Sequence, residues 1–320
     1  MVNLKYTATL FVTATLLMSG CSSTSNSKSA STTNVQQQGT LSLDGARYAH
    51  AMVNDGEKLY VIGGSHNSDF LSSIEIIDPA TKKTLKLNGK IIPRRYFSAV
   101  WDGNESIYIV GGVSLNGDHY KYEKRVEVFN TKTHEVTLVK NLPAPTRTNS
   151  AVLKDGKIFV FGGGYPRAKS MKYQPTVAVY DLIKDTWQRG QDMPTAKATE
   201  AFVKDDYIYV VGGYNGKQSL NTFERYDPTL NRWQSLPAIP YRLSAHSIAL
   251  KGEKLFVFGN YLDTSATYSY DFKTQQWQKS DLDFVAARHT AATTMDNVIY
   301  VSGGITNSSG PSIDNLQIFN

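Results

Sequence analysis

The strongest constraint in this sequence is a short apolar segment that recurs six times and ends in Gly-Gly or Gly-Asn. The copies are LYVIGG (59–64), IYIVGG (107–112), IFVFGG (158–163), IYVVGG (208–213), LFVFGN (255–260) and IYVSGG (299–304). Their last residues lie 48, 51, 50, 47 and 44 positions apart. Each run is short and rich in β-branched and aromatic residues, which predicts a strand. Self-similarity at this period predicts an array of similar structural units.

Each apolar segment also has similar surroundings. Along the chain, another apolar stretch precedes each segment and is joined to it by a turn, such as Asp55-Gly56 or Asp155-Gly156. This arrangement predicts a β-hairpin. Downstream, an aromatic residue is followed seven positions later by tryptophan in three repeats, as Tyr180 and Trp187, Tyr226 and Trp233, and Tyr270 and Trp277. The pattern therefore predicts four strands in each unit.

The double glycine, the Tyr-Asp pair and the tryptophan together resemble the kelch repeat, over residues 39–320. The resemblance implies an all-β fold, a six-bladed kelch-type β-propeller. Thr84 and Val136 replace the tryptophan in the first two repeats, and Asn260 replaces the second glycine of the fifth. The sixth repeat stops after a third strand, LQIFN (316–320). We therefore expect the N-terminal strand, GTLSL (39–43), to close the last blade and remove its exposed edge.

Residues 1–20 have the composition of a leader: Lys5, an apolar stretch from Ala8 to Met18, and Ser19-Gly20 before Cys21. This segment resembles a bacterial lipoprotein signal peptide, which implies that Cys21 becomes a lipidated N-terminus. Ser22 after the cysteine resembles lipoproteins sorted to the outer membrane. An ordinary secretory signal is the alternative, but Cys21 is the only cysteine in the chain. With no second cysteine, no intramolecular disulfide can form.

Residues 21–38 continue from this cysteine with SSTSNSKSASTTNVQQQ, which offers almost nothing to bury. Such a segment is predicted to be a flexible tether. We expect it to hold a domain of residues 39–320 near the lipid bilayer of the cell envelope, either facing the periplasm or at the cell surface.

Composition excludes some partners. The formal net charge is +6, but the basic residues form no run or basic helix, which argues against nucleic acid. The six histidines lack close metal-ligand spacing, so neither a metal nor a cofactor is expected.

The expected site is the face that carries the longer connections, namely 65–73, 113–124, 164–175, 214–221, 261–266 and 305–314. Each repeat also has a basic residue about nine positions before its hairpin turn, and we expect these cations to surround the mouth of the central channel. They are Arg47, Arg95, Arg147, Lys197, Arg242 and Arg288. Two interpretations stay open: the cations bind an anionic ligand, or they belong to the repeat and pair with neighbouring acids or carbonyls.

Tyr165, Tyr214 and Tyr261 lie in the same connections and are candidates for contact with a sugar ring or a protein partner. A non-catalytic binding module for an anionic glycan or an envelope protein is the preferred function. The alternative function is that of a carbohydrate isomerase like the periplasmic N-acetylneuraminate mutarotase, a kelch propeller whose resemblance implies an acidic residue after a glycine pair. The positions here are Ser65, Val113, Gly164, Tyr214, Tyr261 and Ile305, none of them acidic. Glu200 is the weak candidate acid or base, and basic neighbours are expected to keep it ionised.

Overall fold

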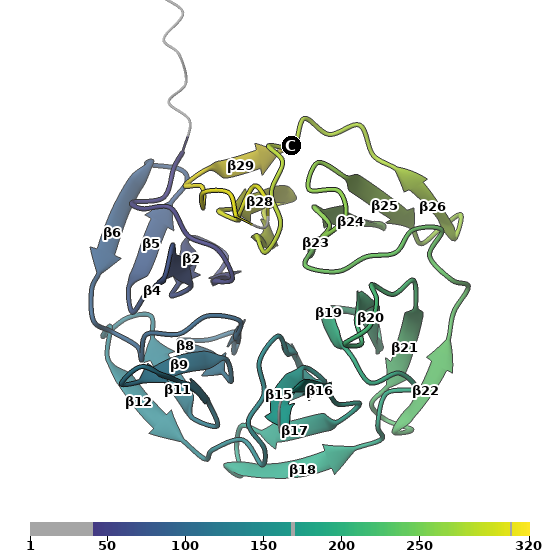
Figure 1. Ribbon diagram of the computed structural model, residues 1–320, viewed down its shortest axis with the longest axis horizontal. Helices are drawn as coiled ribbons and strands as arrows, with labels where there is room; N and C mark the ends of the chain where they lie inside the picture. The colour runs from purple at the N-terminus through teal and green to yellow at the C-terminus, as the bar shows by residue number, and fades with distance from the viewer. Residues whose placement is uncertain (1–40, 168–169, 308) are drawn as a thin grey trace, which may run out of the picture. The chain divides into compact units, whose positions relative to one another are not determined.

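The computed structural model describes residues 41–320 except 168–169 and 308. Its strands form six blades around a central axis (Figure 1), which confirms the six-bladed β-propeller. Within the described ranges there is no α-helix, and so no helix with the length and apolar character needed to cross a bilayer. The predicted leader, Cys21 and the tether lie outside the described residues.

Blades 1 to 3 are four-stranded antiparallel sheets. Blade 1 contains β1 (Ala51–Asn54), β2 (Leu59–Ile62), β5 (Ile74–Asp78) and β6 (Lys83–Leu87). Blade 2 contains β7 (Ser98–Trp101), β8 (Ser106–Val110), β11 (Val126–Asn130) and β12 (Val136–Val139). Blade 3 contains β13 (Ser150–Lys154), β14 (Lys157–Phe161), β17 (Val177–Asp181) and β18 (Thr186–Gly190).

Blades 4 and 5 repeat this arrangement. Blade 4 contains β19 (Ala198–Lys204), β20 (Tyr207–Tyr214), β21 (Phe223–Asp227) and β22 (Arg232–Ser235). Blade 5 contains β23 (Ser247–Lys251), β24 (Lys254–Phe258), β25 (Thr267–Asp271) and β26 (Gln276–Lys279). Blade 6 has only three strands, β27 (Ala291–Met295), β28 (Val298–Ser302) and β29 (Leu316–Phe319).

The N-terminal segment supplies the missing edge of blade 6. Ser42 forms an antiparallel bridge with Asn315, Leu43 N donates to Asp314 O at 2.8 Å, and Leu316 N donates to Leu41 O at 3.3 Å. Leu43 is buried and packs with Met52 of blade 1 and Met295 of blade 6. The predicted closure is therefore confirmed, although the pairing is limited to this short bridge.

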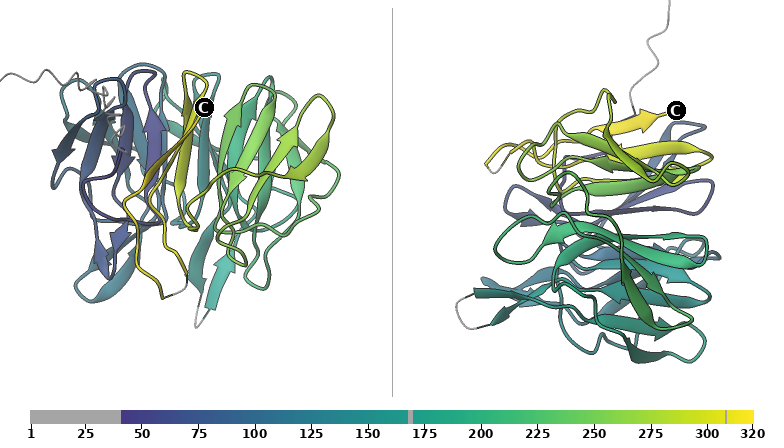
Figure 2. Two further views of the ribbon diagram at one scale, coloured as in Figure 1. Left: turned by 90° about the horizontal axis from the view of Figure 1, so that it is seen from above. Right: turned by 90° about the vertical axis from the view of Figure 1, so that its right-hand side faces the viewer.

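Three of the predicted connections fold into two-stranded ribbons. They are β3 (Ser65–His66) with β4 (Asp69–Phe70), β9 (Val113–Asn116) with β10 (His119–Tyr122), and β15 (Gly164–Arg167) with β16 (Ser170–Tyr173). Figure 2 shows them on the same face of the ring. All three belong to blades 1 to 3, so this face is asymmetric.

Neighbouring blades pack through apolar side chains. Ile62 and Ile76 of blade 1 pack with Phe97, Ile109 and Phe129 of blade 2 or its entry segment. The predicted aromatic pairs are cross-strand neighbours within their blades, with ring centroids 4.9 to 5.0 Å apart: Tyr180 and Trp187, Tyr226 and Trp233, and Tyr270 and Trp277. Such pairs stabilise a sheet beyond their buried area.

The second glycine of the repeat lies where the backbone of the same blade passes close by. Gly64 has φ +95°, and a Cβ there would be 2.7 Å from His50 Cβ and 2.8 Å from Tyr48 O. Only glycine fits both the conformation and the space. This close contact packs the segment after β2 against the segment that leads into β1.

Candidate functional site

Three basic residues of the repeat are buried in ion pairs within their own blades. Arg47 contacts Glu75 and also donates to Gly63 O at 3.0 Å. Arg94 contacts Glu127 and donates to Gly111 O at 2.9 Å. Lys197 Nζ lies 2.7 Å from Glu224 Oε2. Burial lowers the pKa of Arg47, Arg94 and Lys197, while the paired carboxylates oppose that shift.

The other three blades have no such pair at the equivalent positions. In each of blades 1 to 5, one backbone carbonyl accepts a hydrogen bond from the N–H of the second glycine of the preceding blade. In blade order, this carbonyl belongs to Arg47, Arg94, Thr146, Lys197 and Leu243. Where this residue is basic, the second position of the third strand is glutamate. In blade 3 the two positions hold Thr146 and Ala178, and in blade 5 they hold Leu243 and Tyr268. Cation and acid are therefore present together or absent together.

This arrangement corrects the expected ring of six cations at the channel mouth. Arg47 and Lys197 are 1% and 0% exposed and serve the buried ion pairs. Arg242 is exposed, donates to Ser219 O at 3.0 Å, and is not among the residues that line the central cavity. The structural interpretation is therefore the right one for Arg47 and Lys197.

Arg95, Arg147 and Arg288 lie one position after the buried site and take a different direction. Their backbones form antiparallel bridges with Val113, Gly164 and Ile305, the residues that follow the glycine pair. Successive residues of an extended segment point to opposite sides. The arginine side chains consequently leave the blade core and approach the hub.

A series of backbone hydrogen bonds links the residues that follow these arginines to Ala49 and Ala245, which hold the equivalent positions in blades 1 and 5. His289 N donates to Ala245 O, Ala49 N to His289 O, Tyr96 N to Ala49 O, and Thr148 N to Tyr96 O, at 2.7 to 2.9 Å. All five residues have positive φ between 52° and 57°, a conformation that non-glycine residues adopt rarely. Strained backbone of this kind is concentrated at ligand sites. The series joins blades 5, 6, 1, 2 and 3 around the hub.

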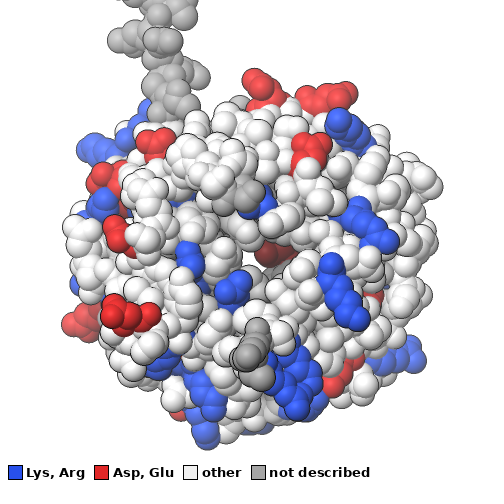
Figure 3. Space-filling view, in the orientation of Figure 1, with Lys and Arg blue, Asp and Glu red and all other residues white. Residues whose placement is uncertain are grey.

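A cavity of about 530 Å³ lies inside this series. Its lining includes Tyr96, Arg147, Glu200, Tyr214, Tyr261 and Arg288. Figure 3 shows a hollow at the centre of the face, with lysine and arginine side chains around it. The volume is within the usual range for small-molecule sites.

The arginines of the cavity region contact aromatic rings and no acid. Arg147 Cζ lies 4.8 Å from the ring centroid of Tyr96, and Arg288 Cζ lies 4.0 Å from that of Tyr261. Arg95 is not among the residues that line the cavity. Its guanidinium donates a hydrogen bond to the Tyr48 hydroxyl at 2.6 Å and packs on the Phe70 ring. Among the described residues none of the three forms an ion pair, and each Nε is buried without a hydrogen-bond partner.

The positive field of these arginines acts on the groups between them. Burial, Arg288, Arg147 and Arg95 lower the pKa of His289 to about 3. Burial likewise lowers the pKa of His246 to about 4, so both imidazoles are neutral at physiological pH. No group of three or more potential metal ligands occurs in the part of the chain that the structure describes.

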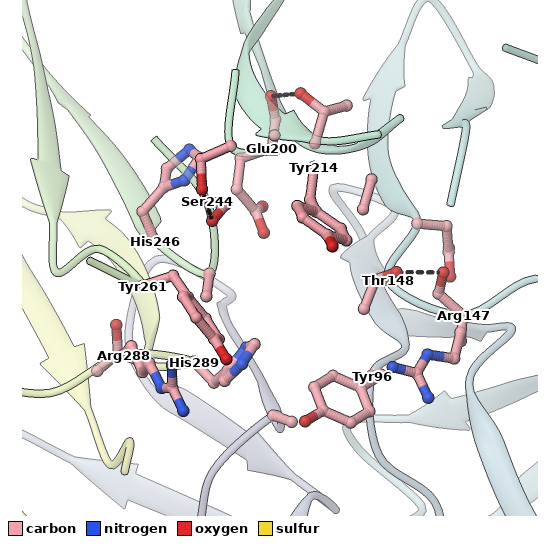
Figure 4. Close-up of a pocket in the computed structure, with 18 of the residues that line it drawn as sticks. Tyr96, Arg147, Thr148, Glu200, Tyr214, Ser244, His246, Tyr261, Arg288 and His289 are labelled. Carbon is pink, nitrogen blue, oxygen red and sulfur yellow. Dashed lines mark hydrogen bonds between the residues drawn. The ribbon is translucent and has the colours of Figure 1, made fainter. Parts of the chain in front are cut away.

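Glu200 reaches the same cavity from blade 4, as Figure 4 shows. By its register with the second strand of the blade, its equivalents in the other blades are Ala51, Ser98, Ser150, Ser247 and Ala291. Burial raises the pKa of Glu200 to about 8, with a hydrogen bond from Ser150 opposing the shift. The expectation of an ionised Glu200 is therefore wrong near neutral pH, because burial favours the neutral carboxyl group and no arginine is among the groups that oppose it.

Two of the three predicted tyrosines lie at the cavity and one does not. Tyr214 and Tyr261 line the cavity, whereas Tyr165 is half-buried on β15 and does not. Sequence reasoning missed Tyr96 and His289, which lie in the hydrogen-bonded series. The available signal was that these two residues directly follow Arg95 and Arg288 in the repeat.

Comparison with known proteins identifies the family of this chain. Residues 49–260 match the family described as the KLHDC2/KLHL20/DRC7 Kelch-repeats domain. The chain is 28% identical over 212 residues to Kelch-like protein 25 of Xenopus tropicalis, covering 62% of this chain and 34% of that protein. It is 26% identical over 245 residues to Kelch-like protein terF of Aspergillus terreus, covering 70% and 53%. It is 27% identical over 246 residues to Spermatocyte protein spe-26 of Caenorhabditis elegans, covering 73% and 42%. The chain thus matches between about a third and a half of the length of these relatives.

Proposed function

This chain belongs to the kelch-repeat family, and we propose that it is a non-catalytic binding module that holds an anionic ligand in its central cavity. The observation that carries the proposal is the state of Arg147 and Arg288. Both line the cavity, and neither is paired with an acid among the described residues. A guanidinium group suits carboxylates, sulfates and phosphates because its donors form a planar fork.

The surroundings favour a ligand over solvent as the partner of these arginines. The rings of Tyr96 and Tyr261 hold the two guanidinium groups from one side and restrict their movement. An immobilised cation loses less entropy when it binds an anion. The neutral histidines His246 and His289 add hydrogen-bonding groups without competing charge. An acidic glycan and an acidic side chain of an envelope protein share this chemistry.

The binding test compares a double variant with a matched control. Arg147→Ala/Arg288→Ala removes both cavity cations, and Arg232→Ala removes an exposed arginine on β22 outside the cavity. Calorimetric titration with a panel of acidic glycans and acidic peptides shows whether the anionic group of the ligand belongs to a glycan or to a protein. We expect the double variant to weaken binding at least about 100-fold and the control to leave it unchanged, because charge-assisted hydrogen bonds contribute about 1.5–3 kcal/mol each. Equal affinity of the double variant and the wild type for every panel member would contradict the proposal.

The proposal includes a location. Residues 1–20 direct export, Cys21 becomes the lipidated N-terminus, and the polar segment to residue 38 tethers the propeller to the outer membrane. The single cysteine after a short apolar stretch supports this assignment. Expressed in a bacterial host with a palmitate analogue, the wild type should become labelled and sediment with membranes, whereas Cys21→Ser should do neither. Equal labelling of the two would rule out the anchor.

A further inference from the structure

The cavity has two chemically different sides. Arg147, Tyr96 and Arg288 lie across the cavity from Glu200 in Figure 4. The arginines contribute to the low pKa of His289. Burial raises the pKa of Glu200 and a hydrogen bond from Ser150 opposes this shift, and no arginine is among its causes. The cations therefore lie on the side of the cavity opposite Glu200.

Blade 4 departs from the other blades where Glu200 enters the cavity. Blade 4 lacks the positive-φ residue that the other blades have at Ala49, Tyr96, Thr148, Ala245 and His289, because the single residue Thr199 separates Ala198 from Glu200. Thr199 instead lies within β19, whose register with β20 shifts between Ala198 and Glu200. A β-bulge redirects a side chain and is frequent beside functional sites. The irregularity places a carboxyl group in the cavity at a level where the other blades have none.

The groups near Glu200 are polar and uncharged. Ser244 is buried, lines the cavity, and shares a hydrogen bond of 2.7 Å with Ser219. Tyr214 at the end of β20 and His246 ahead of β23 also line this side (Figure 4). The charged groups at the cavity wall are Arg147 and Arg288, while Lys197, three residues before Glu200, is paired with Glu224.

We propose that Glu200 is a specificity-determining residue that limits the cavity to ligands with one anionic group and a neutral hydroxylated body, such as a sugar monocarboxylate. This inference rests on the proposed function, since it assumes that Arg147 and Arg288 hold the anionic group.

Two physical reasons support the role of Glu200. Because burial raises its pKa to about 8, the carboxyl group is protonated at neutral pH and donates a hydrogen bond to a ligand oxygen. A second anionic group on the ligand would lie on the side that offers no cation among the described residues. Burying a charge without a partner is costly, so a dianion is disfavoured.

The test uses three probes of similar size: D-glucuronate, D-glucarate with a second carboxylate, and uncharged D-glucose. Calorimetric titration near neutral pH should show binding of D-glucuronate, affinity for D-glucarate at least about tenfold lower, and no binding of D-glucose. If D-glucuronate and D-glucarate bind equally, or D-glucarate binds more tightly, the role of Glu200 is wrong while anion binding stands. If the Arg147→Ala/Arg288→Ala variant binds both acids as tightly as the wild type, the proposed function fails instead.

A pH series provides a second readout. Ionisation of Glu200 should weaken D-glucuronate binding about 30-fold between about pH 6.5 and about pH 9.5, because the neutral fraction falls to a few per cent. Glu200→Gln keeps a hydrogen-bond donor that does not titrate, so its affinity ratio between the two pH values should be close to one. A wild type without pH dependence, or a Glu200→Gln variant with the same dependence, overturns the inference. Thermal melting of each variant checks that it is folded.

Discussion

Replacing Glu127 with alanine is expected to destabilise the propeller by about 3–5 kcal/mol, since the Arg94 guanidinium would stay buried without its partner. Arg94 is 0% exposed, and its remaining acceptors in the blade are Gly111 O at 2.9 Å and Arg125 O at 3.4 Å. Burial already lowers the pKa of Arg94, and Glu127 is the main group that opposes this shift. The effect is measured by chemical denaturation, as a shift of the midpoint at constant m-value.

The protein itself supplies the control for this experiment. Blade 3 has Thr146 and Ala178 at the two positions, and the Thr146 hydroxyl donates to Gly162 O at 2.9 Å. The double variant Arg94→Thr/Glu127→Ala copies that pair into blade 2. We expect it to be more stable than Glu127→Ala, because removing both charges leaves neither one unpaired. A double variant as unstable as Glu127→Ala would mean that packing, and not the buried charge, sets the loss.

Glu200→Gln is expected to stabilise the protein in a pH-dependent way. The folded-state pKa of Glu200 is raised to about 8 from its ordinary value of 4.5, so the folded protein binds a proton that the unfolded chain releases. Between these values each pH unit costs the wild type up to about 1.4 kcal/mol. The variant, which does not titrate there, should match the wild type near about pH 5. It should be more stable by about 2–4 kcal/mol near about pH 8.

Denaturation of both proteins at the two pH values measures this difference directly. Glu57→Gln, at an exposed position in the turn after β1, is the matched control and should show the same small effect at both pH values. An equal stability change for Glu200→Gln at both pH values would show that its carboxyl group is not protonated in the folded protein.

The fold follows from the sequence because each repeat carries its own local signals. Strand-forming runs such as LYVI (59–62) precede the glycine pair. Asp155-Gly156 has the positive φ values that a two-residue hairpin requires. The Tyr–Trp pairs are also local, since their strands are joined by a short turn. Closure by Leu41–Leu43 was predictable because the last repeat offers only three strands.

The position of the cations was predictable only in part. Counting from the hairpin turn with one residue of tolerance combined adjacent positions: one that faces the blade core, the next, which faces the hub, and, for Arg242, the one before. Because neighbouring residues in extended chain point to opposite sides, this single step exchanges a buried ion pair for a cavity arginine. The presence or absence of a glutamate such as Glu75 or Glu127 in the third strand would have distinguished the two positions.

The protonation of Glu200 could not be predicted from the sequence. Its state depends on how deeply the cavity buries the carboxyl group and on the register shift in β19, and both are properties of the assembled ring. Sequence neighbours such as Lys197 suggested a basic environment, but Lys197 is paired with Glu224 inside the blade. Proximity in the chain therefore gave the wrong electrostatic environment.

A crystal structure of the protein with bound D-glucuronate is the most direct test of anion binding at the hub. We expect the carboxylate of the ligand between Arg147 and Arg288, and a ligand hydroxyl within hydrogen-bond distance of Glu200. A ligand bound elsewhere on the propeller, or one whose carboxylate faces Glu200 and leaves both arginines unoccupied, would contradict the account.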